Sequence, residues 1–385
     1  MLEFPEGFLW GTATSAYQVE GGIENNDWSK DFPAGKACDH YNRYEEDFDL
    51  MSELNQNAYR FSIEWARIEP EENKFDRKEI NHYRKVVLAL RQRGITPFVG
   101  LHHFTVPLWL AKKGGGLNKE APKYFERYVK FIVEELGDLV DFWTTLNEPI
   151  LGAVAGYLLK MGPIQERSLL RTIRVIKSEV KTHKRAYKVI HRLKRKAKVG
   201  VAKNNIYFEP YSQKSLLDTF CVSILNYFWN QYFLNRVRDY LDFIGLNYYF
   251  HYRLKFPFLK KNEGKILSDI GWEIYPEGIY WVLRKLEKYQ KPIYITENGL
   301  ADAEDKLRPT FIKDHLFWVH RAIREGVDVR GYFHWSLMDN FEWRQGFEAR
   351  FGLIEIDYKT LHRKLRSSSL LYQKICKENS LKAEV

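Results

Sequence analysis

Two glutamates carry the clearest chemical signal in this sequence. Glu297 lies in KPIYITENG (residues 291–299), where a short apolar run ends in polar residues, and Glu148 follows a similar run in TLNEP (residues 145–149). Each run is typical of a buried strand, so each carboxyl group is expected at the carboxyl end of a strand. Two carboxyl groups about 5 Å apart perform retaining glycoside hydrolysis, and two groups about 6.5–9.5 Å apart perform the inverting reaction. The pair predicts glycoside hydrolysis, and the sequence leaves the separation open.

The residues that would assist this pair also lie at or after apolar runs. They include Gln18, Arg60, His103, Asn147, Asn247, Tyr249, Trp335, Glu342 and Trp343. Amides, a histidine, a carboxylate and flat aromatic rings suit a sugar, which has hydroxyls at its edge and C–H groups on its faces. Arg60 or a phenol beside Glu297 would keep that carboxyl ionised, as a nucleophile must be. Apolar surroundings and the charge of Glu297 would raise the pKa of Glu148 and keep it protonated.

The elements that must position these residues alternate along the chain. The apolar runs are residues 8–13, 58–63, 95–101, 140–146, 199–202, 243–249, 293–295 and 329–335. The amphipathic helical patterns include residues 41–54, 77–93, 122–136, 169–198, 277–289 and 308–325. Strand alternating with helix predicts an α/β fold, a single (β/α)8 TIM barrel over residues 1–385 with its active site at the C-terminal ends of the strands. A doubly wound open sheet is the alternative, although the GxGxxG turn that it would favour is absent from the sequence.

Composition and charge indicate which binding partners and which cellular compartment to expect. The formal net charge is +10, and residues 181–198 form a basic stretch with apolar residues at helical spacing. We expect these charges on the outer face of a barrel helix, not on a nucleic-acid site, and peripheral binding to an anionic membrane is the alternative. Three widely spaced cysteines, the lack of a secretory pattern and the lack of about 18 continuous apolar residues predict a cytoplasmic protein. Abundant Lys, Arg and Glu with few Cys and Met predict a thermostable one.

Six motifs give the sequence a resemblance to a known family. They are WGTATSAYQVEGG, YRFSIEWARIEP, LHHFTVPLW, TLNEP, YITENG and HWSLMDNFEW…GF…RFGL, and they extend from residue 4 to about residue 365. The sequence resembles glycoside hydrolase family 1, the retaining β-glucosidases and β-galactosidases, and it looks like a short, archaeal-type member. The resemblance implies a β-glucosidase-type hydrolase that removes terminal glucosyl or galactosyl residues, and also fucosyl or mannosyl residues, from small β-glycosides. It implies no metal and no cofactor.

The resemblance also assigns roles to individual residues. It implies that Glu148 is the acid/base and Glu297 the nucleophile. The residues that would hold the hydroxyls of the terminal sugar are Gln18, His103, Asn147, Glu342 and Trp343. It further implies that Trp335 forms a stacking floor before a cis peptide bond to Ser336, and that Arg60 and Tyr249 position and tune the nucleophile. An anionic Glu342 would repel a 6-phosphate, so unphosphorylated sugars are expected.

Length sets this chain apart from many family members. It is shorter between residues 22 and 38, around residues 157–167, and most clearly between residues 204 and 242. These segments shape the aglycone region in relatives, so the sequence predicts a more open mouth that accepts long or apolar aglycones. Transglycosylation in place of hydrolysis and a non-catalytic sugar-binding barrel stay as alternatives. The sequence leaves the preferred sugar and the oligomeric state open.

Plainer structural roles compete with some of these assignments. Glu148 precedes a proline and could cap a helix, and His103 could be a packed core histidine. A metal site is disfavoured, because His102 and His103 point to opposite faces of a strand. Asp339, like Glu64 and Asn340, is expected to support the site and not to contact the sugar.

Overall fold

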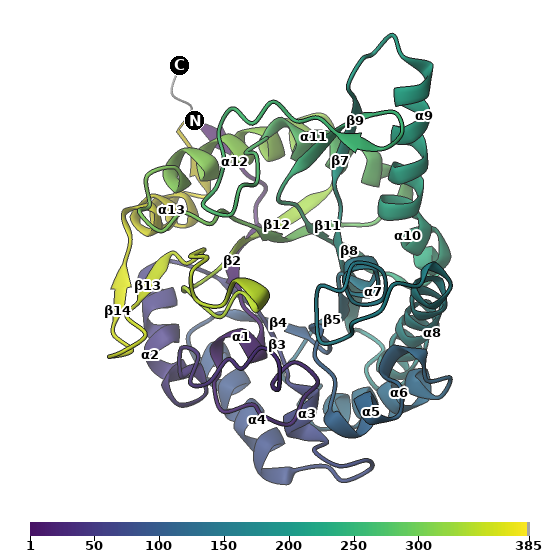
Figure 1. Cartoon of the computed structure of the whole chain (residues 1–385). Helices are drawn as coiled ribbons and strands as arrows, with labels where there is room; N and C mark the ends of the chain where they lie inside the picture. The colour runs from purple at the N-terminus through teal and green to yellow at the C-terminus, as the bar shows by residue number, and fades with distance from the viewer. Residues whose placement is uncertain (383–385) are drawn as a thin grey trace.

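The centre of the molecule is a closed barrel of eight parallel strands in the order β11-β12-β2-β3-β4-β5-β6-β8 (Figure 1). The computed structural model describes residues 1–382, so the last three residues of the predicted 1–385 domain lie outside the described residues. The barrel strands are β2 (Leu9–Ala13), β3 (Ala58–Ser62), β4 (Thr96–Gly100), β5 (Phe142–Asn147), β6 (Lys198–Asn204), β8 (Phe243–Asn247), β11 (Ile293–Asn298) and β12 (Val329–Trp335). Each strand coincides with one predicted run. The (β/α)8 barrel is therefore confirmed, and the open-sheet alternative is wrong.

Helices that follow the strands form the outer layer of the barrel. The six predicted ones are α2 (His40–Glu53), α4 (Arg77–Gln92), α6 (Ala121–Leu136), α8 (Leu169–Leu193), α11 (Glu277–Leu286) and α12 (Arg308–Arg324). In α8 the apolar residues Ala186, Val189 and Ile190 are buried, so the charges of the basic stretch lie outward as predicted. The prediction of a helix up to residue 198 is too long. Lys198 instead begins β6, and its N–H donates to the Asp141 carbonyl at 2.7 Å.

Shorter elements surround both ends of the barrel. The strands among them are β1 (Leu2–Glu3), β7 (Tyr207–Pro210), β9 (His251–Lys255), β10 (Leu259–Lys260), β13 (Ile354–Ile356), β14 (Arg363–Leu365) and β15 (Ser380–Leu381). The helices are α1 (Ala16–Val19), α3 (Trp65–Ile68), α5 (Leu108–Lys112), η1 (Gly115–Leu117), α7 (Pro149–Tyr157), α9 (Leu216–Leu225), η2 (Asn226–Gln231), α10 (Tyr232–Val237), η3 (Arg238–Tyr240), η4 (Glu287–Tyr289), η5 (Trp343–Gln345) and α13 (Ser367–Glu378). β1 pairs with β15, which brings the two ends of the chain together (Figure 1). Within residues 1–382, no helix combines the length and the apolar character needed to cross a membrane.

Aromatic side chains fill the interior of the barrel. Phe98, Phe142, Phe243, Tyr294 and Phe333 pack against one another, with ring centroids 5.0–6.2 Å apart among the pairs in contact. A barrel of this kind is a packed core and not a pore. The same cluster includes the ring at the end of β12. The aromatic core therefore supports the floor of any pocket at the carboxyl ends of the strands.

Two strands extend further than their apolar runs. β11 continues from the predicted residues 293–295 to Asn298, with Glu297 opposite Asn247 of β8 and Asn298 opposite His334 of β12. β6 continues from the predicted residues 199–202 to Asn204, which also lies opposite Asn247. Backbone pairing with neighbouring strands continues past the apolar residues, although the register of β11 shifts after Ile295, so polar side chains remain on the strand at the rim. Asn298, which was predicted to begin the turn, is instead the last residue of β11.

Candidate active site

Glu297 lies on β11 and is buried, with both carboxyl oxygens engaged. The Arg60 guanidinium of β3 forms an ion pair with Oε1, and the Tyr249 hydroxyl donates to Oε2 at 2.6 Å. Arg60 also donates from Nη2 to Asn147 Oδ1 at 2.7 Å. A cation and a phenol on the two oxygens suit a carboxylate and fix its direction. The structure thus brings Arg60 and Tyr249 into contact with Glu297, as the resemblance implied.

Glu148 follows the last residue of β5 and begins a helix without capping it. Its backbone is left-handed, with φ 47° and ψ 53°, and Pro149 starts α7 directly after it. The side chain turns away from that helix, and Oε1 accepts from Asn247 at 2.8 Å and from Asn204 at 3.3 Å. A non-glycine residue in this conformation is uncommon and is held by its surroundings. The capping role considered for Glu148 is therefore wrong, because the carboxyl group points into the site.

Three asparagines fix the space between the two glutamates. Asn247 donates to both Glu148 and Asn147 Oδ1, and the Thr296 hydroxyl donates to Asn247 Oδ1 at 2.7 Å. Asn204 is oriented by Trp229, whose Nε1 donates to its Oδ1 at 3.1 Å. Sequence reasoning placed Asn247 at the opening of the barrel without giving it a specific role, and it missed Asn204. Their signal was present, since both are polar residues at the end of a predicted strand.

The two glutamates differ in their electrostatic surroundings. Burial raises the pKa of Glu148 to about 7, and the nearby charge of Glu297 adds to this effect. Hydrogen bonds from Asn247 and Asn204 act in the opposite direction. The raised pKa agrees with the expectation for Glu148. Burial in a low-dielectric site and a nearby negative charge both favour the neutral acid.

Lys203 is a second residue that sequence reasoning missed. It is 1% exposed on β6, directly before Asn204, and its ammonium donates to the Asn204 carbonyl and lies 5.8 Å from the centre of the Trp229 ring. Burial lowers the pKa of Lys203 to about 7, and the charge of Glu148 opposes that shift. Lys203 in turn lowers the pKa of Glu148. A lysine inside an apolar strand is the sequence signal that could have revealed it.

Aromatic rings form one wall beside the glutamates. The His103 ring stacks between Trp335 and Trp343, with centroids 5.9 and 6.0 Å away, and its Nε2 lies 3.2 Å from the Asn147 amide nitrogen. Burial holds the pKa of His103 well below its usual value, so the ring is neutral and its Nε2 accepts from Asn147. The peptide bond between Trp335 and Ser336 is cis, as predicted. Trp343 also packs against Tyr17 and Trp28.

Gln18 and Glu342 meet next to this aromatic wall, where the Glu342 carboxyl group is also hydrogen-bonded to Trp335. The Gln18 amide donates to Asn340 Oδ1 at 2.9 Å and to Glu342 Oε2 at 3.1 Å, and Gln18 itself is fully buried. Burial, with the charge of Glu297, raises the pKa of Glu342 to about 8. A Glu342 that is mainly neutral at pH 7 would repel a 6-phosphate less strongly, and the expectation of unphosphorylated sugars stays a prediction.

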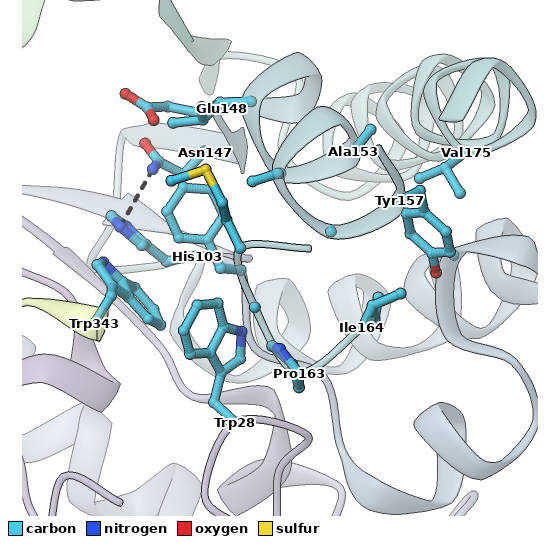
Figure 2. A pocket seen from close by; sticks show the side chains of 18 of the residues that line it. Trp28, His103, Asn147, Glu148, Ala153, Tyr157, Pro163, Ile164, Val175 and Trp343 are labelled. Atoms are coloured by element: carbon cyan, nitrogen blue, oxygen red, sulfur yellow. Dashed lines mark hydrogen bonds between the residues drawn. The ribbon is translucent and has the colours of Figure 1, made fainter. Parts of the chain in front are cut away.

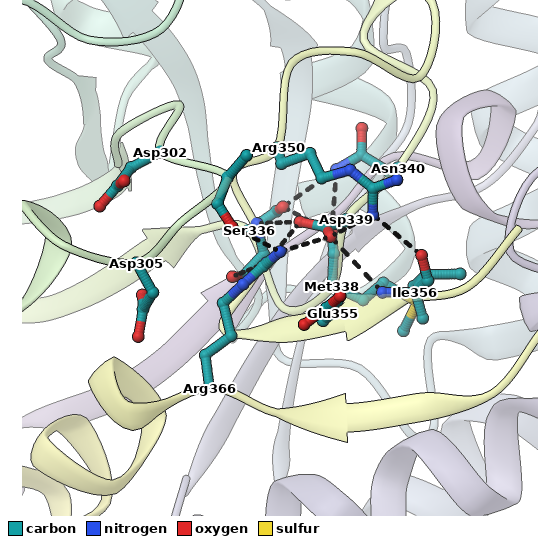
Figure 3. A network of polar contacts seen from close by, with 12 residues as sticks. Asp302, Asp305, Ser336, Met338, Asp339, Asn340, Arg350, Glu355, Ile356 and Arg366 are labelled. Carbon is teal, nitrogen blue, oxygen red and sulfur yellow. Dashed lines mark hydrogen bonds and ion pairs between the residues drawn. The ribbon is translucent and has the colours of Figure 1, made fainter.

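A buried ion-pair network supports the segment that carries Glu342. Asp339 accepts from both terminal nitrogens of Arg366 at 2.8 and 3.0 Å, from Arg350 at 3.0 Å and from the Gly352 N–H at 3.0 Å (Figure 3). Asn340, the next residue, holds Gln18. Asp339 thus acts as the anchor that was expected for it, and Asn340 connects this anchor to the site.

One continuous cavity of about 1190 Å³ joins these groups to the surface. Glu148, Glu297, His103, Trp335 and Glu342 line its inner part. The outer part is largely apolar and includes Leu151, Leu159, Met161, Ile164, Phe208, Leu225, Trp229 and Phe250. Figure 2 shows His103, Asn147, Glu148 and Trp343 on one side of this space and Tyr157, Ile164 and Val175 on the other. The cavity exceeds the range of about 300–1,000 Å³ usual for small ligands, so space remains beyond a single sugar.

Most of the predicted site residues meet in this cavity. Asn147, Tyr249 and Trp343 line it with the residues named above, whereas Arg60 and Gln18 lie behind its wall and contact the residues that do. His102, expected to be structural, faces the Phe125 ring at 6.1 Å.

Many known proteins are similar to this chain in sequence and in structure. The profile of glycosyl hydrolase family 1 matches residues 1–239 and 234–381. Beta-glucosidase A of Thermotoga maritima is 37% identical over 444 aligned positions, which cover 98% of this chain and 99% of that protein. A beta-galactosidase of Pyrococcus woesei is 30% identical over 508 positions, covering 99% and 98%. The solved structure of a beta-glycosidase from Pyrococcus horikoshii is 41% identical with a TM-score of 0.94, covering 100% of this chain and 97% of that one.

These comparisons confirm the resemblance drawn from the motifs. Both alignments are longer than the 385 residues of this chain, so they contain gaps where the relatives have additional residues. The shortness predicted from the sequence is therefore real.

Proposed function

The chain belongs to glycosyl hydrolase family 1, and on this premise we propose that it is a retaining exo-β-glycosidase with Glu297 as nucleophile and Glu148 as acid/base. The observation that carries the assignment is the contrast between the two carboxyl groups. Glu297 accepts from a guanidinium and a phenol, whereas Glu148 accepts only from neutral amides and has its pKa raised to about 7. We further propose that the chain works as one catalytic domain.

In the first step a Glu297 oxygen bonds to the anomeric carbon while the bond to the aglycone oxygen breaks. Glu148 donates its proton to that leaving oxygen. Glu297 loses its charge when it becomes a glycosyl ester. Because that charge helps to raise the pKa of Glu148, ester formation lowers the pKa of Glu148 and prepares it to act as a base. In the second step Glu148 takes a proton from water, and the water oxygen displaces Glu297.

The terminal sugar is proposed to lie on Trp335, with its hydroxyls held by His103, Asn147, Glu342 and Trp343. Gln18 would contribute directly or through Glu342, to which it donates. Arg60 and Tyr249 hold the nucleophile in line for attack. A largely neutral Glu342 can donate a hydrogen bond to a sugar hydroxyl as well as accept one.

The substrate class follows from the relatives. They carry the names beta-glucosidase and beta-galactosidase, so we propose that glucosyl and galactosyl β-glycosides are substrates, with fucosyl and mannosyl ones as further candidates. We propose that the reaction needs no metal or cofactor. Rates on a panel of nitrophenyl β-glycosides, with and without a chelator, test both statements.

The roles of the two glutamates are tested by rescue with azide. In Glu297→Ala we expect turnover to fall by several orders of magnitude, because the covalent step is lost, and azide to yield the α-glycosyl azide. In Glu148→Ala azide should yield the β-glycosyl azide, because Glu297 still forms the intermediate. The anomer is read by NMR.

Three outcomes would count against these roles or refine them. Full activity of Glu297→Ala, or identical anomers from the two variants, would refute the assignment. Failure of the unaltered protein to cleave any nitrophenyl β-glycoside would favour a sugar-binding barrel. Alkyl glycosides as the main product in the presence of an alcohol would favour transglycosylation.

The apolar outer cavity supports a preference for apolar aglycones. Leu151, Leu159, Met161 and Ile164 would contact an alkyl chain attached to the sugar. Each buried methylene contributes about 0.8 kcal/mol, so kcat/KM of alkyl β-glucosides should rise up to about four-fold per carbon until the chain leaves the cavity. Rates that are independent of chain length would contradict this preference.

A further inference from the structure

One helix exposes large apolar side chains on the outside of the molecule. α9 and η2 stand at the edge of the barrel beside β7 and β9 (Figure 1). The exposed residues of this segment are all uncharged: Leu216, Leu217, Thr219, Phe220, Ser223, Tyr227 and Phe228. Leu216 is 86% exposed, and Leu217, Phe220 and Phe228 are each more than half exposed. We call these seven residues the α9 face.

The opposite side of the same helix is already packed. Val222, Leu225 and Trp229 contact a small core around Ile206 and Phe208. A surface helix normally has one apolar stripe and one polar face, and a helix that is apolar all round is normally buried. The α9 face therefore departs from the pattern of a helix that faces water.

The two hydroxyls on the α9 face are already hydrogen-bonded within the helix. Thr219 donates to the Ser215 carbonyl at 3.0 Å, and Ser223 donates to the Thr219 carbonyl at 2.9 Å. Hydroxyls satisfied in this way need no partner from the solvent, so an apolar phase can cover the face without leaving them unpaired.

A neighbouring hairpin enlarges the apolar surface. Phe256 and Phe258, between β9 and β10, and Leu259, the first residue of β10, are each 44–50% exposed. Buried Asp218 of α9 accepts from the Phe256 N–H at 2.9 Å, so it ties this hairpin to the helix. The α9 face and the hairpin tip thus lie next to each other. Together they gather more large exposed apolar side chains than is usual where such residues are scattered singly over an exterior.

Exposed lysines border this surface. They are Lys214, Lys255, Lys260 and Lys261. Nearby acidic groups are engaged: Glu209 pairs with Arg253, Glu263 pairs with Arg253 and Lys265, and Asp218 is buried. The border is therefore positive, on a chain whose formal net charge is +10.

We propose that the α9 face and the hairpin tip dock on the surface of an anionic lipid bilayer. Exposed Leu, Phe and Tyr side chains with a lysine border match the interfacial region, where aromatic rings enter the headgroup layer and lysines meet anionic lipids. A second copy of this chain fits less well, because a two-fold contact would bring two positive borders together. The docked surface adjoins the mouth of the cavity, since Leu225 and Trp229 of the same segment line it.

The test is sedimentation with lipid vesicles. The full chain should co-sediment with phosphatidylcholine vesicles that contain phosphatidylglycerol, and high salt should weaken this binding. The triple variant Leu216→Gln, Leu217→Gln, Phe220→Gln should bind roughly ten-fold or more weakly, because three apolar anchors are lost. Its turnover of a nitrophenyl β-glucoside in solution should equal that of the unaltered chain, which shows that it is folded.

Matched controls locate the effect. Leu170→Gln and Leu370→Gln alter apolar residues that are 72% and 54% exposed on α8 and α13, and both variants should bind like the unaltered chain. Lys184→Gln with Lys188→Gln removes two charges from the basic stretch on α8, and it should have a smaller effect than the triple variant. The proposal is overturned if the unaltered chain does not bind anionic vesicles. It is overturned as well if any of these control variants loses as much vesicle binding as the triple variant. It is also overturned if the unaltered chain is a dimer that the triple variant dissociates.

Discussion

Lys203 and Glu148 form an unusual buried pair at the residue scale. Both groups have pKa values moved to about 7, Lys203 downward by burial and Glu148 upward by burial and by Glu297. Each charge favours the charged form of the other. The ionisation of Glu148, the proposed acid/base, therefore depends on a lysine that lies inside a strand and does not line the cavity.

This coupling predicts a pH shift. Glu148 must be protonated in the first step, so kcat/KM should fall as pH rises through about 7. Lys203→Met keeps the buried volume and removes the ammonium, which makes the carboxylate harder to form. The alkaline limb should move upward by about 0.5–1 pH unit, at or below the low end of the effect of a nearby opposite charge. The measurement is the pH profile of kcat/KM with a nitrophenyl glucoside.

A charge change elsewhere serves as the control for that profile. Lys188→Met removes a lysine from α8 whose Nζ lies 5.6 Å from the Tyr240 ring centre, and it should leave the limb in place. If the alkaline limb of the kcat/KM profile does not move in Lys203→Met, or moves equally in Lys188→Met, Lys203 does not tune the pKa of Glu148.

At the scale of elements, the segment after β12 depends on an ion pair far along the chain. Asp339 is fully buried and pairs with Arg366, which precedes α13 and has a side chain 4% exposed. Through Asn340 and Gln18 this anchor is connected to Glu342. Without Arg366, the buried carboxylate of Asp339 would keep the partly exposed Arg350 but lose its buried cation, and this is costly.

Removal of that cation should lower stability and loosen the sugar site. Arg366→Met should reduce the free energy of unfolding by about 3–5 kcal/mol, and KM should rise more than kcat falls because Glu342 is held less firmly. Arg350→Met is the matched control, since Arg350 is 26% exposed and makes a single bond to Asp339, so its loss should cost less. Chemical denaturation and steady-state kinetics measure the two effects, and equal losses in both variants would contradict this explanation.

The sequence predicted some secondary-structure elements correctly and missed others. The apolar runs predicted all eight barrel strands, because burial on both faces leaves a strong local pattern. They missed the polar ends of β6 and β11, where pairing between strands and not hydrophobicity maintains the structure. The three-stranded sheet β10-β9-β7 was missed as well. Its β9–β10 pair is a short local hairpin, and its β7–β9 pair joins segments more than forty residues apart, such as Tyr207 and His251.

At the scale of the whole molecule, charged residues form networks between neighbouring helices. Arg93 at the end of α4 pairs with Glu45 and Asp49 of α2, and Arg67 pairs with Glu20 and Glu79. Networks of this kind gain importance at high temperature, because the cost of desolvating charges falls as temperature rises. The composition that predicted thermostability therefore has a structural counterpart.

The expected consequence is a high melting temperature. Mesophile domains unfold at about 45–65 °C, and we expect this protein to unfold above about 65 °C. Differential scanning calorimetry measures the melting temperature. Its change between low and high salt reports how much exposed ion pairs contribute to thermal stability. A transition within the mesophile range would contradict the prediction. The cytoplasmic location stays a prediction.

The sequence alone determined the fold and the family, and it predicted the two carboxyl groups that we propose react. These depend on local features, namely the apolar pattern of each strand and the residues that follow it. The tertiary structure decided the properties that depend on neighbours distant in the chain. It made Glu342 mainly neutral near pH 7, placed Lys203 beside Glu148, and left the α9 face exposed. The pKa of a group and the exposure of a side chain depend on which segments surround it, and that arrangement exists only after the barrel has closed.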